Sequence, residues 1–198
     1  MIRECDGDGV AGAHDFGTFV SDTTHFRPSV FDERAAMPTL LRLLPTLRDE
    51  AVVSAVAGHL RRRWARPTAF AALRDAFELW AESSPAAGWQ LGDALATAAD
   101  ETRLADVLRV AEDRRYGKSR QMIVHSLWRY KTDEHVRHAL THLVDDPDVA
   151  LHAASALRRA IGNEAALPVL RAARERHNDI TVKRSLGREI TKAERAIA

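Results

Sequence analysis

The chain has 198 residues with a formal net charge of +1, and its one cysteine, Cys5, excludes an intramolecular disulfide framework or a multi-thiolate metal site. No stretch approaches the ~20 apolar residues of a membrane span, and the N-terminus lacks the basic and apolar segments of a secretory signal. The composition therefore predicts a cytoplasmic protein that does not enter a membrane, with one structural domain as the starting expectation.

Residues 1–33 are predicted to form an acidic leader, because they hold two basic residues against seven acidic ones and show neither helical nor strand periodicity. Their second half contains four phenylalanines, and each buried ring contributes roughly 1.5 to 3 kcal/mol. The leader is therefore expected to be partly disordered or docked on the first repeat, with docking expected over residues 16–33.

The remainder of the chain, residues 34–198, predicts paired helices from apolar residues spaced at i, i+3, i+4 and i+7. Pro45 is expected to kink or end the first helix, because an interior proline removes a backbone donor. The predicted pairs are 35–48 with 49–65, 67–83 with 85–99, 101–115 with 118–131, 133–145 with 148–161, and 163–177 with 179–197.

A repeat lies within the second helix of each pair. Five nine-residue segments align without gaps and end on an apolar residue, and these final residues recur at intervals of 35, 32, 30 and 33. The fifth position of each segment is apolar and the sixth is small or β-branched, which predicts a tight apolar stripe on one face. The final residues, called the anchors below, are Leu60, Leu95, Leu127, Leu157 and Ile190.

Start and stop signals fit this register. Asp49, Asp100, Asp133 and Asn163 are predicted N-caps. The stop signals are Gly117 and Gly162, each of which follows a helical pattern, and Asp146-Pro147-Asp148, which predicts a turn between two helices.

The run DDPDVALHAASALRRAIGNEAALPVL at residues 145–170 resembles the HEAT-like repeats of the armadillo superfamily, including the phycobilin-lyase type. The usual Val-Arg at the start of the second helix survives only as Ser119-Arg120 and Val182-Lys183. The resemblance implies an all-α, right-handed α-α superhelix of about five antiparallel helix pairs, whose second helices line the concave face. In such a stack, stability comes from neighbouring pairs and the end repeats must be capped.

A basic and aromatic stripe is predicted at the C-terminal edge of the second helices. Most positions two residues beyond the anchors are basic, and such a line of cations can follow a phosphate backbone or offset helix dipoles. Trp64 and Trp89 are predicted at the surface, whereas Trp80 and Trp128 are predicted in the core. The predicted binding residues are Arg62, Trp64, Trp89, Arg129, Tyr130, Arg159 and Lys192.

Signatures of catalysis are missing from the sequence: no glycine-rich phosphate loop, no Gly-x-Ser-x-Gly and no HExxH occurs. His135, His138 and His142 share one helical face, and a solvated histidine face is the interpretation preferred over a metal site. Neighbouring carboxylates such as Asp145-Asp146 are attributed to solubility and capping. No catalytic residue, cofactor or metal is therefore expected.

The sequence predicts a non-catalytic binding scaffold that holds a protein or peptide on its concave face. The alternative is a nucleic-acid-binding protein similar in fold and size to the HEAT-like alkylpurine DNA glycosylases, for which Asp93 near Trp89 is the first carboxylate to inspect. A third possibility, a lyase or chaperone for a tetrapyrrole-bearing protein, follows only from the repeat resemblance.

Overall fold

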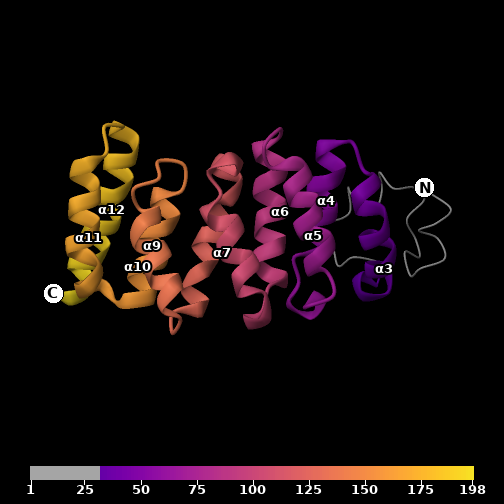
Figure 1. Ribbon diagram of the computed structural model, residues 1–198, viewed down its shortest axis with the longest axis horizontal. Coiled ribbons are helices and arrows are strands. Elements are labelled where there is room, and N and C mark those ends of the chain that lie inside the picture. The colour runs from indigo at the N-terminus through magenta and orange to yellow at the C-terminus, as the bar shows by residue number, and fades with distance from the viewer. Residues whose placement is uncertain (1–31) are drawn as a thin grey trace. The chain divides into compact units, whose positions relative to one another are not determined.

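The computed structural model describes residues 32–198, which are all-helical and contain ten α-helices, five short 3-10 helices and no strand (Figure 1). The predicted all-α class is thereby confirmed. The chain divides into two compact units after Ala98. Residues 1–31 of the predicted leader lie outside the described residues, whereas its last two residues, Asp32 and Glu33, cap and begin the first described helix.

The N-terminal unit, described from residue 32, consists of two helical hairpins. Within it, α6 packs against both α4 and α5, and α3 packs against α4. Its elements are α3 (Glu33–Leu43), η1 (Leu44–Thr46), α4 (Glu50–Leu60), η2 (Arg63–Ala65), α5 (Phe70–Trp80) and α6 (Pro85–Ala98). As predicted, the first helix ends close to Pro45: α3 stops at Leu43, and Pro45 lies in the 3-10 turn η1.

Local signals explain where these helices begin. The Asp32 carboxylate accepts hydrogen bonds from the backbone N–H groups of Arg34 and Ala35 at 2.8 and 3.2 Å, and Asp49 accepts one from Val52 at 3.0 Å. Such N-caps satisfy donors that have no partner inside the helix. Pro85 occupies the first position of α6, where its missing N–H costs nothing.

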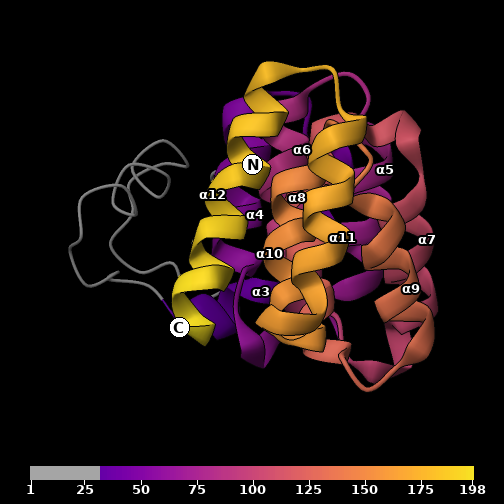
Figure 2. The same cartoon turned by 90° about the vertical axis from the view of Figure 1, so that its left-hand side faces the viewer.

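The C-terminal unit, residues 99–198, is centred on α10, which packs against α8, α9, α11 and α12. Its elements are η3 (Glu101–Arg103), α7 (Leu104–Glu112), η4 (Arg114–Arg120), α8 (Gln121–Ser126), η5 (Leu127–Tyr130), α9 (Glu134–Leu143), α10 (Ala150–Ile161), α11 (Asn163–Arg176) and α12 (Ile180–Ile197). Figures 1 and 2 both show α11 and α12 side by side, joined by a short turn. A connection this short makes the two helices antiparallel neighbours.

The aligned positions of the predicted repeat form the buried face of each second helix. All five anchors are buried, with exposed fractions between 0% and 7%. The fifth positions, Val56, Leu91, Ile123, Ala153 and Leu186, are buried as well, and so are the sixth positions except Gly187. The ungapped alignment therefore identified the core side of these helices correctly.

A buried ion pair links the end of η4 to the turn between α9 and α10. Arg120 is fully buried, and its guanidinium donates to Asp146 Oδ2 at 2.8 Å, to the Ala111 carbonyl at 2.9 Å and to the Gly117 carbonyl at 3.1 Å. The attribution of Asp146 to solubility and turn capping is therefore incomplete, since its side chain is only 4% exposed and neutralises a buried cation. Its Oδ1 also accepts from the Asp148 backbone N–H at 3.1 Å.

One of the predicted caps differs in the structure. Asn163 is the first residue of α11 and not its N-cap, a place taken by Gly162 with φ 89° and ψ 159°. The Asn163 side chain instead accepts from Arg158 Nε at 3.0 Å. Asp100 caps the 3-10 turn η3 that precedes α7, through the Thr102 N–H at 3.0 Å.

Candidate functional site

In the N-terminal unit, the predicted stripe residue Arg62 is held by a carboxylate. Its Nε and Nη2 each lie 2.9 Å from an oxygen of Glu33, in a two-point ion pair. His59 Nδ1 lies 3.3 Å from the same carboxylate, and burial lowers the pKa of His59, although the hydrogen bond to the Glu33 carboxylate opposes the shift. Trp64 is half-buried, with the Arg34 guanidinium 5.5 Å from its ring centre.

Trp89 is half-buried on α6, one turn before Asp93. The Asp93 side chain is 13% exposed and pairs with Arg61 through a 2.6 Å contact from Nη1. The carboxylate that the glycosylase resemblance singled out is thus engaged by an arginine of its own unit.

In the C-terminal unit, two predicted stripe arginines lie on aromatic rings. The Arg159 guanidinium lies 3.6 Å from the centre of the Trp128 ring, a close cation–π contact. Arg129 lies 5.6 Å from the ring centre of Tyr130, which is buried. Trp128, predicted in the core, is half-buried beneath Arg159.

Lys192, the last predicted stripe residue, belongs to a three-residue charge cluster. Its Nζ lies 2.6 Å from Glu189 Oε1, and Arg158 Nη1 lies 2.6 Å from Glu189 Oε2. The Glu189 side chain is only 3% exposed, so the two cations neutralise a buried charge. Lys192 therefore stabilises its own unit by pairing with the buried Glu189 carboxylate.

A hollow of about 290 Å³ crosses three successive second helices of the C-terminal unit. It lies at their N-terminal ends, whereas the stripe was predicted at their C-terminal edge. Residues of the chain around α8, α10 and α12 line it: Lys118, Gln121, Pro147, Asp148, Ala150, Leu151, His152, Asp179, Thr181, Val182 and Ser185. We call this feature the second-helix hollow.

His152 supplies the most perturbed group of the second-helix hollow. Burial lowers the pKa of His152 to about 4, and the neighbouring His125 on α8 adds to the shift. The two rings meet edge to face with centroids 6.2 Å apart. His152 Nδ1 is buried and has no hydrogen-bond partner among residues 32–198, so a neutral imidazole with one unused polar atom borders the hollow.

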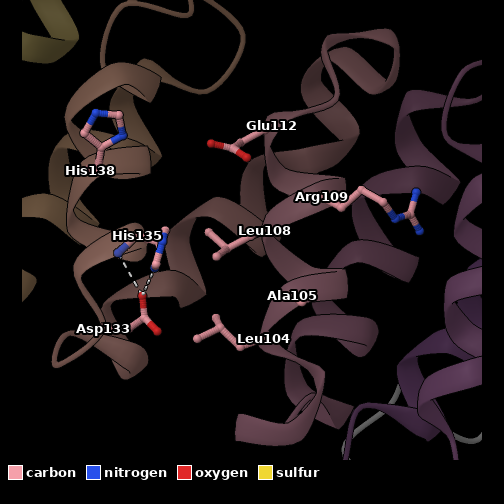
Figure 3. A pocket seen from close by; sticks show the side chains of 8 residues that line it. All are labelled: Leu104, Ala105, Leu108, Arg109, Glu112, Asp133, His135 and His138. Atoms are coloured by element: carbon pink, nitrogen blue, oxygen red, sulfur yellow. Dashed lines mark hydrogen bonds and ion pairs between the residues drawn. The ribbon is translucent and has the colours of Figure 1, made fainter.

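A second, larger groove of about 720 Å³ lies between the first helices α7 and α9 (Figure 3). Leu104, Ala105 and Leu108 of α7 give it an apolar side, and Leu104 and Leu108 point toward α9. Its polar lining residues are Arg109, Glu112, Asp133, His135 and His138. Glu112 extends from α7 toward α9.

The three histidines predicted on one helical face separate in the structure. His138 and His142 contact each other with a 3.0 Å Nε2–Nε2 distance, whereas His135 turns to Asp133, with its Nδ1 3.5 Å from Oδ1. Within the described range, no group of three or more histidine, cysteine or acidic side chains converges on a metal position.

The second-helix hollow was not predicted as a site. His152 occupies the fourth position of the aligned segment 149–157, where the sequence gives no sign that a histidine borders a cavity. The signal that was available is the exposed apolar side chain next to it, because Leu151 lies on the polar side of a helix whose alanines and Leu157 form the buried stripe.

Comparison of the chain with protein-family models, with curated proteins and with solved structures gave no match. In residues 32–198, no helix combines the length and apolarity that a membrane crossing demands.

Proposed function

We propose that this chain is a HEAT-like α-solenoid, a right-handed stack of about five antiparallel helix pairs, and that it acts as a non-catalytic scaffold. Its partner is a protein or peptide segment that binds the second-helix hollow on α8, α10 and α12. The observation that carries the proposal is the hollow itself, which is lined by three successive second helices.

The recurrence of buried anchors supports the solenoid. All five anchors are buried, Leu127 at the first position of η5 and the other four within α4, α6, α10 and α12. The last helix, α12, buries Leu186, Ile190 and Ala193 but exposes polar side chains along its other side.

The lining of the second-helix hollow suits a peptide. Leu151 is 37% exposed, and with Val182 it offers an apolar contact. His152, whose burial keeps the imidazole neutral, also lines the hollow.

Charge argues against a phosphate backbone in this hollow. Its lining contains one cation, Lys118, and two carboxylates, Asp148 and Asp179. Of the predicted stripe, Arg62 and Lys192 already hold carboxylates within their own units. The protein or peptide interpretation is therefore favoured over nucleic-acid binding.

The test compares the native chain with two single variants, Leu151→Glu at the hollow and Leu79→Glu at an exposed leucine of α5. Affinity enrichment from the native host should recover a specific protein with the native chain and with Leu79→Glu, but not with Leu151→Glu. Equal recovery by all three would exclude the hollow as the binding site.

Nucleic-acid binding predicts a different outcome. Labelled duplex would bind at low salt, and the logarithm of its affinity would fall by about 0.9 per log unit of salt for each phosphate neutralised. Such binding, unaffected by Leu151→Glu, would replace the scaffold proposal.

A further inference from the structure

Two exposed histidines on α9 face each other through their Nε2 atoms. His138 and His142 lie one turn apart, their ring centroids are 4.3 Å apart, and their Nε2 atoms are 3.0 Å apart. Without a bound metal ion, the Nε2–H of one imidazole donates a hydrogen bond to the Nε2 of the other. If both rings carry their proton on Nδ1, two Nε2 lone pairs are available at that point.

We propose that His138 and His142 form a two-histidine chelate for a divalent transition-metal ion, with water in the remaining coordination positions. Binding forms two metal–Nε2 bonds, releases two water molecules from the ion and moves the proton of the donating ring from Nε2 to Nδ1, since the accepting ring already carries its proton there. The proposal does not rest on the scaffold function, since α9 does not line the second-helix hollow.

The separation of the two nitrogens is compatible with bonds from both to one metal ion. With metal–nitrogen bonds of about 2.0–2.1 Å, nitrogens 3.0 Å apart subtend an angle of roughly 94° at the metal. That angle fits neighbouring positions of a square-planar or octahedral ion, as Cu²⁺ and Ni²⁺ prefer. A tetrahedral Zn²⁺ site would need nitrogens about 3.3 Å apart.

The helix holds the pair in place. Val136, Ala139, Leu140 and Leu143 bury the opposite side of α9, so the backbone between the two histidines is fixed. Imidazoles at i and i+4 project from the same face of a helix. Binding therefore orders only side-chain torsions.

The groove that His138 borders is lined by charges of both signs, Glu112 and Arg109 of α7 (Figure 3). His135, one turn before His138, is directed to Asp133 and is not part of the chelate. It is therefore a matched control on the same helix.

The test uses the untagged full-length chain with Cu²⁺ or Ni²⁺ as the probe. Titration calorimetry should show one site in the native chain and an unchanged affinity in His135→Gln. His138→Gln and His142→Gln should each weaken that site at least tenfold, because one imidazole remains. Zn²⁺ should bind more weakly than Cu²⁺.

Electron paramagnetic resonance of the Cu²⁺ form gives a second readout. Two equatorial nitrogen couplings are expected in the native chain and one in each of the His138 and His142 variants. Circular dichroism should show the same helicity in all variants, since both side chains are exposed. Native affinity in both variants, or an equal loss in His135→Gln, would overturn the proposal.

Discussion

Replacing Asp146 by alanine should destabilise the C-terminal unit far more than the same change at the adjacent Asp145. Asp146 is 4% exposed and holds the fully buried Arg120. Asp145 forms a two-nitrogen contact with Arg176, in which the side chains are 36% and 54% exposed. Two neighbouring carboxylates thus provide a buried pair and an exposed pair in one turn.

The expected costs follow from burial. Removing one partner of a buried ion pair leaves an uncompensated charge and costs about 3–5 kcal/mol. An exposed pair contributes about 0–1 kcal/mol, because water screens the charges. Asp146→Ala should therefore cost several kcal/mol more than Asp145→Ala.

The assay is urea unfolding of the full chain, followed by circular dichroism and tryptophan fluorescence. The double variant Arg120→Met/Asp146→Leu should cost less than the sum of its single variants, because neither charge then remains buried. Equal costs for Asp146→Ala and Asp145→Ala would refute the assignment of Arg120 and Asp146 as a buried pair.

Three further predictions concern single positions. Leu95→Ala should cost about 2–5 kcal/mol, because this anchor is 1% exposed, while Leu79→Ala on the exposed surface should change the unfolding free energy by less than about 0.5 kcal/mol; similar losses would contradict the assigned core. Gly162→Ala should cost about 1–3 kcal/mol because φ 89° and ψ 159° suit only glycine, whereas Gly58→Ala, where a Cβ meets nothing within 4 Å inside α4, should stabilise by about 0.5–1 kcal/mol; thermal unfolding should separate the two in opposite directions. The pKa of His152 is lowered from 6.5 to about 4, so its contribution to stability is complete above pH 6.5 and is lost as the pH falls from 6.5 to 4, where the unfolded chain binds more protons; His152→Gln should flatten this part of the urea-midpoint profile, and an unchanged slope would contradict the shift.

The fold was largely predictable because its signals are local or periodic. The anchors, the caps Asp49 and Asp133 and the interruption at Pro45 each depend on residues close in sequence. Asn163 was mistaken for a cap because glycine and asparagine are both favoured at this boundary, and the positive φ belongs to Gly162.

The candidate site was less predictable because it depends on contacts between distant residues. Arginine is usually a surface residue, and the burial of Arg120 is explained only by its hydrogen bonds to Ala111, Gly117 and Asp146. Likewise, the repeat register marks where Lys192 lies but not that Glu189 is buried beneath it. Periodicity defines faces, whereas ion pairs depend on which long side chains meet across them.

The most direct test of the central claim, that a peptide binds across α8, α10 and α12, is amide chemical-shift mapping of the full chain with the segment of the partner protein recovered by the native chain. We expect the largest shifts on residues of the second-helix hollow, including Leu151, His152 and Val182. Leu151→Glu should abolish these shifts, whereas Leu79→Glu should not. Shifts confined to the N-terminal unit, or to the α7 and α9 groove, would contradict this claim.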